Sequence, residues 1–165
     1  MTHHPLVGGA LREIAYGSAA YAAACRLRQE VLRTPLGLRL ADEDLRPERQ
    51  QLHFGWFTPQ NELLACVIAA PQDPSAVKLR QMAVAAALQR QGVGRALLEG
   101  VEGILAEHGV RQLMLHARLS AVGFYQRLGY QEQGEIVEVI GLPHRAMHKR
   151  LGLRNPPAVG SHGVR

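Results

Sequence analysis

The sequence has few cysteines, few aromatic residues and no long apolar run. Its 165 residues include only two cysteines, Cys25 and Cys66, and Phe, Trp and Tyr together make up 5%. Two cysteines are too few for a disulfide scaffold and show no metal-ligand spacing, so we expect buried, reduced thiols and no metal. No apolar run is long enough to span a bilayer, and the N-terminus lacks the pattern of a secretory signal. We therefore expect a cytoplasmic protein that has no contact with the membrane.

The charge of the chain is basic but scattered. Lysine and arginine number 19 against 14 acids, which leaves a net charge of +5. An excess of positive charge favours anionic partners. The basic residues form no run interleaved with aromatics, so nucleic-acid binding has little support. A small ligand that carries phosphate fits the charge equally well.

The hydrophobic pattern predicts one mixed α/β domain over residues 1–151. A strand ends near Gly17, and an amphipathic helix follows Ser18 and stops near Pro35, because proline disfavours helix in the residue before it. The next segments are predicted to be an antiparallel strand pair (51–57 and 63–70), a strand (77–84) and a helix (95–108). A strand (110–117), a short helix (120–128) and a last pair of strands (133–139 and 144–150) follow. Residues 152–165 show no periodicity and are predicted to be a disordered tail.

The most informative stretch is Leu88–Leu98, "LQRQGVGRALL", between a predicted strand and a predicted helix. The first turn of a helix leaves backbone N–H groups without partners, and the helix dipole makes them attractive to phosphate. Gly92 and Gly94 lack a Cβ atom, so a pyrophosphate can approach the chain closely. Arg90 and Arg95 can add charge-assisted hydrogen bonds. The competing interpretation is that the glycines only make a tight turn.

Three kinds of phosphate-binding loop can be compared with this stretch. A Walker loop needs Lys followed by Ser or Thr after its last glycine, but Arg95-Ala96 stands here. A dinucleotide-binding fingerprint needs a small residue where this chain has Leu97. The third pattern, Gln/Arg-x-x-Gly-x-Gly/Ala after a strand, is matched in full by Gln89–Gly94.

With "LRQMAV" before this hexapeptide and "FYQRLGY" after it, the chain resembles the GNAT superfamily of acetyl-CoA-dependent N-acetyltransferases from about Leu11 to Leu151. "LRQEVLRTPLG" and "GLPHRAM" resemble a small bacterial subgroup whose substrates are often unassigned. The resemblance implies a mostly antiparallel central sheet, splayed open and flanked by helices, with acetyl-CoA as cosubstrate. Its pantetheine arm would pair with the backbone of Met82, Ala83 and Val84. Its pyrophosphate would lie on the residues of the glycine stretch, which are Gln89, Arg90, Gln91, Gly92, Val93, Gly94 and Arg95.

The resemblance also implies roles around the thioester. Tyr125 matches the tyrosine that lies near the sulfur as acid or hydrogen-bond donor, although it could instead pack beside Phe124. The thioester oxygen would receive a hydrogen bond from a backbone N–H of the splayed strand, here that of Val84. Many relatives carry an asparagine ahead of the tyrosine where this chain has Arg118. The contact that this asparagine makes to the cosubstrate in relatives is therefore not predicted for this chain.

The base that accepts the proton of the amine is not readable from the sequence. Histidine titrates in the useful range, and His116 at a strand end and His144 in a predicted loop are the leading candidates, ahead of His53. A chain of waters could replace any single base. Direct attack in a ternary complex is favoured over a covalent intermediate on Cys25 or Cys66, since neither cysteine falls on the motif strands.

The acceptor stays open among peptide, polyamine, aminoglycoside and metabolite amines. The acids Asp42, Glu43 and Asp44 could attract a cationic amine or could simply be solvated. A non-catalytic acyl-CoA-binding sensor is the alternative function, and a basic nucleic-acid binder is the third hypothesis. Strand sharing into a homodimer is also compatible with the predicted sheet.

Overall fold

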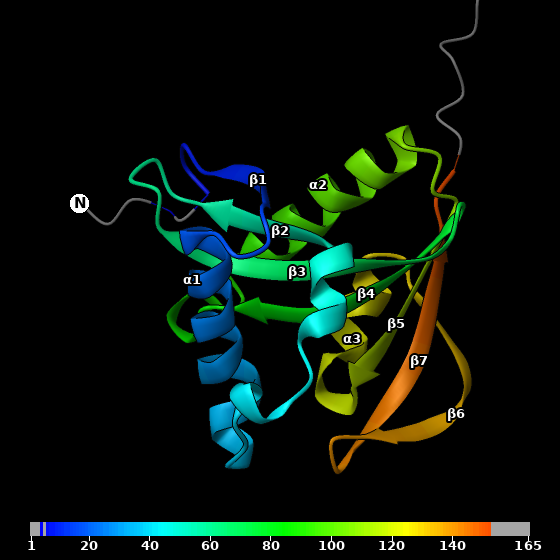
Figure 1. Ribbon diagram of the computed structural model, residues 1–165. Helices are drawn as coiled ribbons and strands as arrows, with labels where there is room; N and C mark the ends of the chain where they lie inside the picture. The colour runs from blue at the N-terminus through cyan, green and yellow to red at the C-terminus, as the bar shows by residue number, and fades with distance from the viewer. Residues whose placement is uncertain (1–3, 5, 153–165) are drawn as a thin grey trace, which may run out of the picture.

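The structure, a computed structural model, describes residue 4 and residues 6–152. The predicted order of strands and helices is confirmed (Figure 1). The elements are β1 (Ala10–Ile14), α1 (Ala19–Arg28), β2 (Leu52–Phe57), β3 (Leu63–Asp73), β4 (Ala76–Val84), α2 (Val93–Glu107), β5 (Gln112–Arg118), α3 (Val122–Arg127), β6 (Gln131–Val139) and β7 (Leu142–Arg150). The predicted tail lies, apart from Gly152, outside the described residues. None of the helices in the described part combines the length and hydropathy that a bilayer crossing requires.

The first helix begins where the sequence predicts but changes its geometry early. The Ser18 hydroxyl accepts a hydrogen bond from the Tyr21 N–H at 3.1 Å, which is an N-cap. Regular α-helix ends at Arg28, and a π-helical turn over Gln29–Arg33 follows it. Arg28 is only 1% exposed, although an arginine in an amphipathic helix usually lies on the polar face. Its guanidinium is buried because it has an acidic partner inside the protein.

The seven strands form one sheet in the order β1-β2-β3-β4-β5-β7-β6. Every neighbouring pair is antiparallel except β4 and β5, which run parallel. This parallel pairing covers only Ala76–Lys78 against Gln112–Met114. Beyond Lys78 the two strands have no ladder between them, and Figure 1 shows them diverging. The expected mixed α/β fold with a mostly antiparallel, splayed sheet is confirmed.

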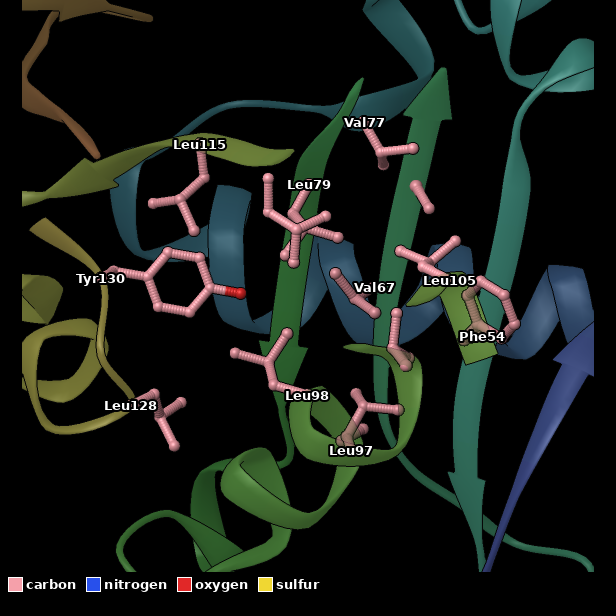
Figure 2. Close-up of a cluster of buried hydrophobic side chains, with 14 of the residues drawn as sticks. Phe54, Val67, Val77, Leu79, Leu97, Leu98, Leu105, Leu115, Leu128 and Tyr130 are labelled. Carbon is pink, nitrogen blue, oxygen red and sulfur yellow. The ribbon is translucent and has the colours of Figure 1, made fainter. Parts of the chain in front are cut away.

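The two faces of the sheet are covered by different helices. On one face, α2 and α3 pack over the main apolar cluster, part of which is drawn in Figure 2. Val77 and Leu79 of β4 and Leu115 of β5 point into this cluster. On the other face, α1 packs over a smaller cluster that includes Cys66 and Ala83. Because side chains alternate along a strand, the neighbours of the buried β4 and β5 residues face the α1 side.

A buried ionic network ties α1 to the segment of short turns that connects it to β2. Arg28 holds both carboxylate oxygens of Glu48, at 2.8 and 2.7 Å. The hydroxyl of Tyr21 donates to the same carboxylate at 2.6 Å. Burial alone would raise the pKa of Glu48, but these hydrogen bonds outweigh it and hold that pKa below its usual value. The pair is a charged, fully enclosed clamp between two segments.

Replacing Glu48 tests whether the clamp supports the fold. In Glu48→Ala the guanidinium of Arg28 stays buried without a counter-charge, so the free energy of unfolding should fall by about 3–5 kcal/mol. Urea denaturation followed by circular dichroism measures it. Asp44→Ala is the matched control, because Asp44 pairs with Arg46 on the surface and its loss should leave stability unchanged. Equal effects of the two substitutions would contradict the clamp.

Candidate functional site

The glycine stretch forms the junction between β4 and α2. Gly92 caps the helix with φ +84°, a left-handed conformation that glycine adopts without strain. The first backbone hydrogen bond of the helix joins the Ala96 N–H to the Gly92 carbonyl at 3.0 Å. The amides of Val93, Gly94 and Arg95 precede that bond and have no acceptor within the helix. The first turn carries no acidic side chain. The junction therefore suits an anion.

Gly94 has a structural reason of its own. A Cβ atom at this position would lie 3.0 Å from Met82 Cε, 3.2 Å from Val84 Cγ2 and 3.3 Å from Phe124 Cζ. The missing side chain lets α2 pack closely against β4 and α3. Gly92 and Gly94 thus differ: one supplies an unusual backbone angle and the other supplies close packing.

The glutamines of the motif hold the loop in place. Gln89 Nε2 donates to the Val84 carbonyl at 3.3 Å, and Gln91 Nε2 donates to the Ala87 carbonyl at 3.1 Å. Arg90 between them has φ +66° and an exposed side chain. The loop is therefore tied to the end of β4, while its arginine is free to reach a ligand.

The edge of β4 that faces β5 is open at its carboxyl end. The Ala85 N–H donates to the Leu64 carbonyl of β3 at 2.9 Å. In an antiparallel ladder bonded and non-bonded pairs alternate, so the next pair, Ala65 and Val84, exchanges no hydrogen bonds. The N–H and C=O of Val84 consequently point away from β3, toward the gap. An extended ligand in this gap would meet backbone donors and acceptors.

A β-bulge bends β4 at the start of this open edge. The pairing register with β3 shifts between Cys66 and Ile68, and Gln81 takes a φ of +55°. The Gln81 side-chain oxygen accepts hydrogen bonds from Arg28 Nε at 3.4 Å and Arg33 Nη2 at 3.3 Å. The buried network of α1 therefore also holds the bulge.

A cleft of about 320 Å³ opens where β4 and β5 diverge. Its walls come from β4, β5, β7, the π-helical turn and the β6–β7 turn. Five of the residues singled out by sequence line it: Met82, His116, Arg118, Tyr125 and His144. Ala83 instead lies in the buried α1-side cluster. The amides of the glycine stretch lie beyond the α2 end of the same gap.

Tyr125 both packs and faces the cleft. Its ring lies edge-on to Phe124, with centroids 5.1 Å apart, and to Tyr130 at 5.6 Å. Its hydroxyl donates to Met82 Sδ at 3.5 Å. Burial raises the pKa of Tyr125 to about 12, so the hydroxyl stays protonated at neutral pH. The two alternatives for this residue, packing and function, are compatible.

Two histidines reach the cleft from neighbouring strands. His116 lies on β5, and burial together with the charges of Lys78 and His144 lowers its pKa. His144, which the sequence predicts at the boundary between a loop and the last strand, lies within β7, opposite Arg118. Its Nδ1 is 2.9 Å from the Leu142 carbonyl. A carbonyl only accepts, so Nδ1 donates, and Nε2 of the neutral ring carries the free lone pair.

The expectation that His53 borders the cleft is wrong. His53 is 3% exposed, and its Nε2 donates to the Glu48 carbonyl at 2.8 Å. The ring of Tyr21 stands edge-on to it at 5.2 Å. His53 lies on β2, two strands away from the gap, where it is a satisfied packing residue.

Comparison with known proteins identifies a family and several relatives that resemble this chain in sequence. A family model described as the acetyltransferase (GNAT) domain matches residues 26–151. The uncharacterized N-acetyltransferase YitI of Bacillus subtilis is 34% identical over 96 residues, which cover 58% of this chain and 60% of YitI. The chain spans about half the length of the curated relatives that it matches.

Solved structures share the fold. A provisionally assigned N-acetyltransferase of Lactobacillus plantarum superposes with a TM-score of 0.78 at 25% identity, covering 87% of this chain and 99% of that protein. A GNAT family acetyltransferase of Elizabethkingia anophelis, solved with acetyl-CoA bound, gives 0.65 at 18% identity, with 87% and 99% covered. At 18% identity, the similarity to the Elizabethkingia anophelis structure shows only that the two proteins share a fold.

The two cysteines make a testable contrast. Cys66 is buried on β3, and burial raises its pKa to about 12; Cys25 on α1 is half-buried, and neither lines the cleft. At pH 8 about 10⁻⁴ of the Cys66 side chains would be thiolate. Ellman's reagent should therefore leave Cys66 unmodified in folded Cys25→Ser protein and titrate it after unfolding in urea. Rapid modification of folded Cys25→Ser would contradict the assigned burial.

Proposed function

Since this chain belongs to the GNAT acetyltransferase family, we propose that it transfers the acetyl group of acetyl-CoA to the nitrogen of a primary amine. The observation that carries the proposal is the β4–α2 junction, where unpaired amides of a helix N-terminus adjoin an open strand edge. A diphosphate linked to an extended amide-containing arm is complementary to both parts. Coenzyme A has that constitution.

The binding site would be made mostly of main chain. The pantetheine arm would lie along the stretch Met82, Ala83 and Val84, at the edge that β5 leaves open. By the alternation of the ladder, Val84 turns its N–H and C=O toward this edge, whereas those of Ala83 face β3. The diphosphate would lie on the N–H groups between Gln89 and Arg95. Arg95 is exposed, with its Nε 2.8 Å from Glu99, and Arg90 is exposed on the loop. Both arginines can turn toward phosphate, because surface ion pairs are weak.

The chemistry would use groups from three strands and a helix. Acetyl transfer needs a neutral amine, a donor for the thioester oxygen and stabilisation of the departing thiolate. The orientation of the Val84 N–H supports it as the donor to the oxygen. The protonated hydroxyl of Tyr125 would donate a hydrogen bond to the thiolate. With a pKa near 12, it acts better by holding its proton than by giving it up.

Direct attack by the amine is the step that the site favours. The depressed pKa of His116 favours its neutral ring at pH 7, and the Nδ1 of His144 is engaged with the Leu142 carbonyl, which leaves Nε2 as the ring nitrogen that can accept a proton. Either ring can receive the proton that the amine loses as the new C–N bond forms and the C–S bond breaks. Both cysteines lie off the cleft lining, so a covalent cysteine intermediate has no support.

A release assay tests this function against the sensor alternative. The protein is incubated with acetyl-CoA and grouped amines, and free coenzyme A thiol is measured. An acetyltransferase releases thiol above the hydrolysis background in at least one group. Binding of acetyl-CoA with no release across all groups would favour a non-catalytic acyl-CoA sensor instead. The homodimer stays a prediction; the edge strands of the sheet are β1 and β6.

A matched pair of substitutions at Gly92 tests the diphosphate site. Asparagine and aspartate both tolerate left-handed backbone and have nearly the same shape, but aspartate adds a negative charge beside the free amides. Gly92→Asp should raise the KM for acetyl-CoA at least tenfold more than Gly92→Asn does, since the carboxylate repels the diphosphate. Steady-state kinetics measure the ratio, and thermal melting controls for folding. An equal KM in the two variants would refute the site.

Removing one oxygen tests Tyr125. Tyr125→Phe keeps the ring that packs against Phe124 and Tyr130 but removes the donor. We expect kcat to fall by about 10²-fold, a typical loss for one donor to a developing charge, with little change in the KM for acetyl-CoA. Single-turnover kinetics separate this step from product release. An unchanged kcat with chemistry rate-limiting would leave Tyr125 a packing residue only.

A further inference from the structure

We propose that the amine acceptor carries an anionic group, a carboxylate or a phosphate, which is held by cationic side chains on the α1 side of the cleft; this rests on the proposed function. The side chains that give the cleft this character are Arg33, Lys78, Arg80 and Arg118. No aspartate or glutamate is among the described residues that line the cleft.

The topology places these cations together on one face. Val77 and Leu79 point into the α2-side core, so Lys78 and Arg80 point to the opposite face. Leu115 and Ala117 likewise leave His116 and Arg118 on the α1 side. Arg118 also stands directly opposite His144 on β7. The amides at the N-terminus of α2 belong to the other face, so these cations are separate from the proposed diphosphate site.

The cations lack acidic partners, with one exception. Arg33 pairs with Glu43 at 2.6 Å. Arg80 donates to the neutral Gln51 side chain at 2.9 Å, and Arg118 donates to the Leu32 carbonyl at 2.8 Å. The side-chain ammonium of Lys78 has no hydrogen bond or ion pair to any other described residue. The cleft therefore holds positive charge that the surrounding described chain does not neutralise.

The titration of the cleft groups agrees with this charge balance. Burial and the neighbouring Arg80 lower the pKa of Lys78, and burial and Arg33 lower the pKa of Arg118. Burial, Lys78 and His144 lower the pKa of His116. Each of these groups is disfavoured in its charged form by like charge nearby. An anion in the cleft would relieve that repulsion.

The acids proposed to attract a cationic amine do not supply a free carboxylate to the cleft. Of the three consecutive acids Asp42, Glu43 and Asp44, Glu43 is bound to Arg33 and Asp44 to Arg46. Asp42 lies outside the cleft lining. A polyamine or aminoglycoside would bring several positive charges into a cationic cleft. An amine bearing an anion is attracted by its own acidic group, and the positive surroundings also favour the neutral, attacking form of its nitrogen.

Matched amines test the proposal. The pairs are L-phenylalanine with phenethylamine, which differ by a carboxylate, and O-phosphoethanolamine with ethanolamine, which differ by a phosphate; spermidine is the polycation. We expect kcat/KM for at least one anionic amine to exceed that of its neutral-tailed partner tenfold or more, because hydrogen bonds to charged groups are worth about that much. The pair that shows the preference tells carboxylate from phosphate.

Charge-removing variants locate the preference. Lys78→Met and Arg118→Gln should each reduce the anionic preference about tenfold. Arg150→Gln removes one positive charge from an exposed position outside the cleft lining and should leave the preference unchanged. A higher kcat/KM for phenethylamine, ethanolamine or spermidine would overturn the proposal, as would an equal effect of Arg150→Gln.

Binding separates this proposal from the proposed function. Isothermal titration calorimetry of the same five amines needs no turnover. Tighter binding of an anionic amine, lost in Lys78→Met but kept in Arg150→Gln, supports the proposal even if no thiol is released, in which case the proposed transferase function fails alone. Tighter binding of the neutral-tailed amines or spermidine, or no binding and no turnover of either anionic amine, overturns the proposal itself.

Discussion

The whole site depends on a parallel pairing that stops after three residues. β4 and β5 are joined only at Ala76–Lys78, and from there each strand is held by other neighbours, β3 on one side and β7 on the other. The main core under α2 fixes the buried faces of both strands, so the gap cannot close without breaking that packing. An unpaired strand edge inside a sheet normally costs stability. Here it is kept open, and it leads directly to the N-terminus of α2.

The gap is shaped from both faces of the sheet. On the α2 side, Gly94 allows the helix to approach β4 closely, which brings its free amides to the end of the open edge. On the α1 side, Arg28 and Glu48 form a buried clamp that reaches the bulge at Gln81. The two proposed binding sites lie on different faces: the backbone donors proposed for a diphosphate lie on the α2 side, and the cationic side chains proposed for the acceptor lie on the α1 side.

Much of the fold, including the junction between β4 and α2, could be predicted from sequence, because both depend on local pattern. The hexapeptide Gln89–Gly94 marks the junction without any knowledge of tertiary structure, and the alternation around it marks the strands. The buried role of Arg28 could not be predicted, since an arginine on an amphipathic helix looks like a surface residue until its partner, twenty positions away, is known. The same limit explains the misplacement of His53. Lys78 and Arg118 lie forty residues apart in the sequence, on β4 and β5. Both line the cleft that opens where these two strands diverge, so their proximity could not be predicted from local pattern.

The central claim is that main-chain N–H groups at the β4–α2 junction bind the diphosphate of coenzyme A. Two-dimensional ¹H–¹⁵N NMR of the labelled protein, titrated with coenzyme A, observes those groups directly. The account predicts that the amides of Val93, Gly94 and Arg95 show the largest downfield shifts, as donors to phosphate oxygens, and that inorganic pyrophosphate at higher concentration reproduces them. Saturating coenzyme A that shifts other regions and leaves these three amides unmoved would contradict it.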